Sequence, residues 1–114
     1  MDKQPLGQVI FGHGNAFALT AAMGTTPQLI KQGRGQVGVV FNNQNAAQTS
    51  SVTIYDAGAT DSGTLAASNK ILDAAVLQAQ SAAAGRQQLD IPFANGLVIV
   101  ASAAITGISW VSYD

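Results

Sequence analysis

The chain has 114 residues, which is enough for one domain with one core and too short for two ordinary domains. It contains no cysteine, which excludes disulfides and thiolate-ligated metals, and its net charge of −1 gives no field that would draw it to nucleic acid or to an anionic membrane. Charged residues make up only 10% of the chain, where an ordinary soluble domain carries roughly 25%.

The kind of charged residue is as informative as the number. All six acidic residues are aspartates, and the scarcity of glutamate and lysine argues against a helix-rich protein. A surface with so few charges resists aggregation poorly by itself. We therefore expect much of it to be covered by other subunits, although an all-β domain with neutral surface loops would have the same composition.

The first residues predict an arm, because Pro5 and Gly7 break regular structure and little around them is apolar. This polar start does not resemble an export signal, so we expect the protein to be made and used from the cytoplasm of its producing cell. The domain organisation expected is an arm over 1–11 and a single domain over 12–114. The arm ends in an apolar segment that could be a short strand or an anchor for a neighbouring subunit: Val9, Ile10 and Phe11.

Short runs of strand-forming residues follow, separated by glycine, asparagine and proline turns. In chain order the expected strands are 17–20, 28–32, 36–42, 51–56, 69–73, 87–93, 97–101 and 105–113. The runs 36–42 and 51–56 are the strongest, and Val52 and Ile54 alternate with Thr53 and Tyr55. We expect these two runs to form a hairpin, with 44–50 as its long polar loop.

The stretch 65–88 is ambiguous. Its leucines, isoleucine and alanines could form an amphipathic helix, but no acid–base pairs support one, and a strand at 69–73 followed by a loop is favoured slightly. The stretch 91–113 carries no charge and is long enough for a membrane span. Asn95-Gly96 is a turn signal within it, and β-branched residues and serines follow, so we interpret it as a hairpin.

These elements predict an all-β protein: an antiparallel β-sandwich or jelly roll of about seven or eight short strands, with a short helix or a long loop in 65–88.

Candidate catalytic groups are few. His13 is the only histidine, and no acid lies near it in the sequence to orient it, so it predicts an exposed loop residue. Asp56 and Asp61 share a loop, but their spacing does not match a calcium site, and Asp56 is expected to cap a turn. No enzyme signature, metal site or cofactor is predicted.

Other side chains favour contacts over chemistry. Arg34 and Arg86 are isolated cations that could bond across a subunit boundary, or be ordinary exposed arginines. Trp110 and Tyr113 could form a platform for a sugar, but a single tryptophan inside an apolar strand predicts core packing. The expected interface residues are Val9, Ile10, Phe11, Arg34 and Arg86.

Over about residues 28–113 the chain resembles small structural proteins of tailed bacteriophages. The resemblance is carried by the order of a glycine-led valine strand (36–42), the strand Val52-Thr53-Ile54-Tyr55-Asp56, the run 91–100 beginning Ile91-Pro92-Phe93, and a last strand ending in an aromatic residue (108–113). It is a pattern of strands, so it transfers no functional residues.

The resemblance implies a compact sandwich on the virion. Within that class we expect a capsid decoration (cement) protein that binds the major capsid protein from outside, is homo-oligomeric with a trimer favoured, and contacts neither nucleic acid nor membrane. The alternatives are a tail, baseplate or head-fibre module, and, from a different class, a carbohydrate-binding module.

Overall fold

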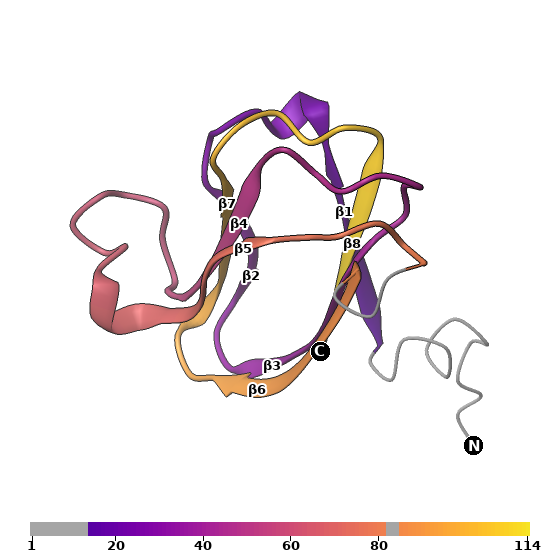
Figure 1. Cartoon of the computed structure of the whole chain (residues 1–114). Helices are drawn as coiled ribbons and strands as arrows, with labels where there is room; N and C mark the ends of the chain where they lie inside the picture. The colour runs from indigo at the N-terminus through magenta and orange to yellow at the C-terminus, as the bar shows by residue number, and fades with distance from the viewer. Residues whose placement is uncertain (1–13, 82–84) are drawn as a thin grey trace, which may run out of the picture.

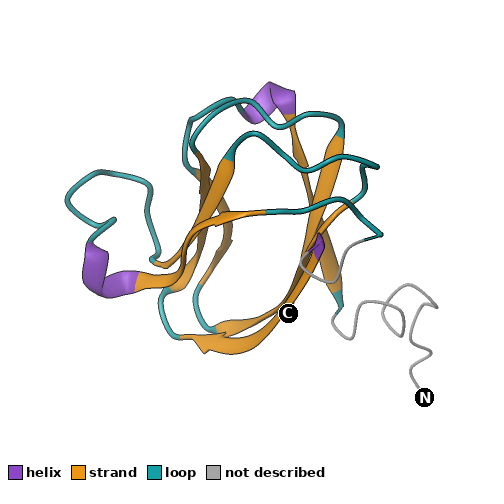
Figure 2. Ribbon diagram, in the orientation of Figure 1, coloured by secondary structure: helices purple, strands orange, loops and turns teal. Residues whose placement is uncertain are grey.

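The computed structural model describes residues 14–81 and 85–114. In this part of the chain the protein is all-β, with eight strands in two antiparallel four-stranded sheets and two short 3-10 turns (Figure 2). The predicted all-β sandwich is confirmed. The elements are β1 (Asn15–Thr20), η1 (Ala21–Met23), β2 (Gln28–Gln32), β3 (Gly35–Asn42), β4 (Ser51–Asp56), η2 (Ala67–Asn69), β5 (Lys70–Val76), β6 (Arg86–Phe93), β7 (Gly96–Ala101) and β8 (Ile108–Tyr113).

The strand order is that of a jelly roll. Sheet A has the order β1-β8-β3-β6 and sheet B the order β2-β7-β4-β5. The pairs β1–β8, β2–β7, β3–β6 and β4–β5 are nested, as in one long hairpin whose tip is the β4–β5 connection. When this hairpin is wrapped, β8 also pairs with β3 and β7 also pairs with β4, which produces two facing sheets (Figure 1).

This topology corrects two of the predicted hairpins. β3 and β4 do not pair, because they lie in opposite sheets, and 44–50 crosses from one sheet to the other. The Asn95-Gly96 turn likewise joins β6 in sheet A to β7 in sheet B, and β7 and β8 also lie in opposite sheets. Among the described strands, β4 and β5 are the one pair adjacent in both the chain and a sheet.

The ambiguous stretch is resolved as a strand and a loop. β5 covers Lys70–Val76, and its seven residues are preceded by the single turn η2. No helix among the described residues is long and apolar enough to cross a bilayer.

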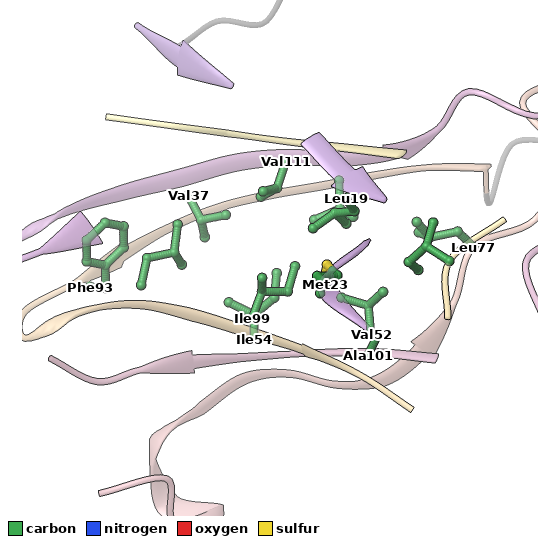
Figure 3. Packing of buried hydrophobic residues seen from close by; sticks show 13 residues of the cluster. Leu19, Met23, Val37, Val52, Ile54, Leu77, Phe93, Ile99, Ala101 and Val111 are labelled. Carbon is green, nitrogen blue, oxygen red and sulfur yellow. The ribbon is translucent and has the colours of Figure 1, made fainter. Parts of the chain in front are cut away.

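The core lies between the sheets and is built by the inward side of each strand. Figure 3 shows Val37 and Val111 of sheet A facing Ile54 and Ile99 of sheet B, with Phe93 at one end of the cluster. The core residues largely alternate with outward-facing ones along their strands, because successive side chains point to opposite faces of a sheet. The Val52 and Ile54 face of β4 is buried, as predicted.

Truncating a buried and an exposed leucine tests this description of the core. Leu97 is fully buried on β7, whereas Leu29 on β2 is 42% exposed. We expect Leu97→Ala to lower the free energy of unfolding by about 2–5 kcal/mol, because it removes buried methyl groups and leaves a cavity. Leu29→Ala should cost less than about 1 kcal/mol. Denaturant titration of both variants measures the difference, and equal losses would contradict the core described here.

Candidate interaction surface

A row of side chains crosses the outer face of sheet A. The strand registers place Ala18 opposite Trp110, Trp110 opposite Phe41, and Phe41 opposite Arg86. Val111, the next residue after Trp110, belongs to the core. Because side chains alternate along a strand, the row points away from the core. The outside of sheet A therefore presents two aromatic residues beside a guanidinium group.

One further large apolar side chain lies beside this row. Ile108, opposite Thr20 on the same side of the sheet, is 39% exposed, and Trp110 is half-buried. An antiparallel sheet that faces water normally carries polar residues on its outer side. Larger exposed apolar patches mark interaction sites. We name this surface the sheet A face and define it by Ala18, Thr20, Phe41, Ile108 and Trp110.

The placement of Trp110 corrects its predicted core position. Ser109 and Val111 on either side of it are fully buried and take the inward positions of β8, which leaves Trp110 on the outer side. The other aromatic residue of the predicted platform, Tyr113, packs against the core instead. The apolar run predicts a strand here, but it does not determine which of its side chains face the core.

Of the predicted interface residues, the two that the structure describes, Arg34 and Arg86, lie at opposite ends of the β3–β6 pair. Arg86 is exposed at the first position of β6 and ends the row on the sheet A face. Arg34 is exposed next to Gly35, which pairs with Phe93 at the other end of the same two strands. Val9, Ile10 and Phe11 lie outside the described residues, as does His13.

Arg34 borders a shallow hollow instead. Its volume is about 410 Å³, and one wall carries the Asp56 carboxylate at the end of β4. Both oxygens of that carboxylate accept hydrogen bonds from the backbone of the β6–β7 turn, from Ala94 N at 3.0 and 3.1 Å and from Asn95 N at 2.8 Å. Asp56 therefore holds this turn against β4, which is the capping role predicted for it.

These bonds set the charge state of Asp56. Burial, the largest single influence, raises the pKa of the carboxyl group, but the backbone N–H groups of Ala94, Asn95 and Gly96 together outweigh it. The net result is a pKa below the ordinary value of 3.8. The carboxylate form is the one that the turn stabilises.

At the opposite end, a buried polar cluster joins three connections: 43–50, 77–81 and 102–107. Asn42 donates from Nδ2 to the carbonyl oxygens of Ala46 and Gln78, at 2.9 Å each. Gln48 donates to the Asn42 side-chain oxygen at 3.0 Å and to Thr106 O at 2.8 Å, and accepts from Thr106 N at 2.9 Å. Asn42 and Gln48 are almost fully buried, so these bonds supply the partners that burial requires.

Sequence reasoning missed this cluster. It assigned Asn42 to the end of a strand and Gln48 to a polar loop, and nothing in the order of residues distinguishes a buried glutamine from an exposed one. The cluster explains why the long 44–50 connection can cross between the sheets in one conformation.

The described residues hold no group of three or more histidine, aspartate or glutamate side chains that could bind a metal. Asp61, the second aspartate of the 56–64 stretch, accepts from the Thr64 hydroxyl at 2.7 Å and from Thr64 N at 3.1 Å. It stabilises its own turn.

Comparisons with known proteins identify no relative. No family model matches the chain, and neither a curated protein nor a solved structure matches it significantly.

The Asp56 contacts predict a pH-dependent contribution to stability. Because the pKa of Asp56 is lower in the folded protein than in the unfolded chain, its contribution is present above the unfolded value and is lost as the pH falls through the folded value. The unfolding free energies of the protein and of Asp56→Asn, measured from about pH 7 to about pH 2.5, should therefore differ most at high pH and converge below 3.8. A difference that stays constant across the range would count against this role.

The buried cluster predicts a second loss of stability. Gln48→Ala leaves the Thr106 backbone groups without their partner, which should cost about 1–3 kcal/mol in free energy of unfolding. The exposed Gln80, whose side chain donates to the Asn45 side-chain oxygen at 2.8 Å, provides the control Gln80→Ala, expected near the wild-type value. Equal behaviour of the two variants in denaturant titration would show that the cluster does not stabilise the loops.

Proposed function

We propose that the protein is a virion structural protein, a capsid decoration (cement) protein that binds the outside of the major capsid shell of a tailed bacteriophage and stabilises it. The observation that carries the proposal is the sheet A face, where Ile108 is exposed and Trp110 is half-buried on the outer side of a sheet. In a chain with only 10% charged residues, this surface fits a protein that is covered after assembly.

The chemistry of the surface supports a protein partner. Large apolar and aromatic side chains with an arginine at the margin are the composition of interface hot spots, where tryptophan and arginine are enriched. Trp110 has that position, with Phe41 beside it in register and Arg86 at the end of the row. Binding through a mostly apolar face should also depend little on salt concentration, because ion pairs contribute little to its affinity.

The architecture supports a structural role without specifying it. Jelly rolls serve in viral capsid proteins and also in lectins and enzymes, so the fold alone does not choose between them. A tail, baseplate or head-fibre module would use the same apolar face against a different virion protein. The capsid is favoured through the strand pattern of residues 28–113 and its resemblance to phage structural proteins.

A carbohydrate-binding module is the second candidate, and one observation favours it. Trp110 and Phe41 are opposite each other on an outward face, and adjacent rings of this kind can stack on the apolar side of a sugar. A glycan array distinguishes the two functions. Binding that is lost in Trp110→Ala would support the sugar function, and an array without signal would remove it.

The capsid proposal is tested with particles that lack the protein. When the coding sequence is disrupted in the parent phage and purified protein is added back to the capsids, we expect saturable binding that raises the capsid melting temperature. Trp110→Ala should weaken this binding by about tenfold or more, since a buried tryptophan at an interface contributes strongly.

Leu29→Ala is the matched control, because it truncates an exposed apolar side chain on sheet B. It should bind as the unmodified protein does. Absence of saturable binding to the capsid would refute the cement function, and binding that is insensitive to Trp110 would exclude the sheet A face as the contact.

A further inference from the structure

The four edge strands of the sandwich differ in how they are protected. The edges are β1 and β6 in sheet A and β2 and β5 in sheet B. An exposed edge is a template for pairing with another chain, and proteins protect edges with bulges, charged side chains and proline. A comparison of these devices among the four strands shows which edge is open to a partner.

Three of these described edges are bulged. On β2 the register with β7 shifts between Leu29 and Lys31, so that the extra residue lies on the edge strand. On β6 the register shifts between the partners of Val37 and Val39, which places one extra residue on the edge strand, and Asp90 there has a φ of 50°. The register between β4 and β5 shifts twice, each time with the extra residue on the edge strand β5, and Ala74 there also has a φ of 50°.

The same three strands also carry charge or proline. β2 contains Lys31, β5 contains the ion pair Lys70–Asp73, and β6 contains Arg86, Asp90 and Pro92. Each of these features opposes the approach of another strand.

β1 has none of these devices. It pairs with β8 over six successive residues, from Asn15 to Thr20, with no shift in register. Its sequence, NAFALT, contains no charge, proline or glycine. Among the described residues β1 pairs with β8 alone, and its outward side chains, Ala16, Ala18 and Thr20, are small.

We propose that β1 pairs antiparallel with β1 of a second copy of this chain about a two-fold axis, joining the two four-stranded A sheets into one continuous sheet. A two-fold axis perpendicular to the sheet keeps the core side of one copy next to the core side of the other. The pairing is isologous, so it closes with two copies and does not propagate.

A register centred on Ala18 places compatible side chains opposite each other on both faces of the joined sheet. It sets Ala18 opposite Ala18 of the second copy, and Phe17 opposite Leu19 of the second copy on the inner side, where both already contact or belong to the core. Cross-strand pairs of this kind are the unit of sheet stabilisation. On the outer side the row continues from Phe41 and Trp110 over the two alanines to Trp110 and Phe41 of the second copy.

The dimer thus doubles the sheet A face into one apolar band bounded by an arginine at each end. Its two-fold symmetry differs from that of the trimer favoured for a capsid decoration protein. The pairing concerns the isolated protein and therefore holds or fails independently of capsid binding.

The first test is the oligomeric state of the full chain. Light scattering at about 100 µM should give the mass of a dimer. Ala16→Lys, which places a charge on the exposed outer side of β1, should raise the dissociation constant by about tenfold or more. The control Ala103→Lys introduces the same side chain at an exposed position of the β7–β8 connection and should leave the dimer intact.

The second test uses the absence of cysteine from the chain. Under mild oxidation Ala18→Cys should form a covalent dimer quickly, because Cβ atoms of directly opposed residues lie about 4.5–5.5 Å apart and a disulfide needs only a small closure. Ala103→Cys is the control and should cross-link slowly. A monomer or a trimer at about 100 µM, a dimer unaffected by Ala16→Lys, or equal cross-linking of the two cysteines would each overturn the proposal.

Discussion

The nested pairing of the strands is the constraint on which the rest of the structure depends. Apart from β4 and β5, each ladder between the described strands joins strands that are separated along the chain by at least one other strand, and β1 is paired with β8. Long-range pairings of this kind cost loop-closure entropy, and this cost is offset only when the sheets also pack on each other. We therefore expect the core and the strand pairing to form together. The constraint fixes which faces point inward and which strands are left at the edges.

Much of the fold could be predicted from the sequence, and the part that could not is the pairing. Alternation in 51–56 gave the buried Val52 and Ile54 correctly, because burial on one side of a strand is a local property. The Asn95-Gly96 turn was also located correctly, but the strand that follows it joins the opposite sheet. A turn signal states that the chain reverses and does not state in which layer it continues.

The proposed contact surface was harder to predict for the same reason. Arg86 was identified as a candidate contact, but its neighbours Phe41 and Trp110 are brought to it only by the pairing of β6, β3 and β8. The sequence between Ile108 and Tyr113 is apolar or small throughout, so which alternate residues face water depends on the sheet that β8 joins. Low charge content was the one global signal of a covered surface, and it does not say where that surface is.

We propose that the outer side of sheet A is the surface that the capsid covers. Hydroxyl-radical footprinting with mass spectrometry measures this directly, by comparing oxidation of side chains in the free protein and in the protein bound to capsids. Trp110 and Ile108 should be protected on the particle, while Leu29 on sheet B should be oxidised to the same extent as in the free protein. Protection of Leu29 with unchanged oxidation of Trp110 would contradict the proposal.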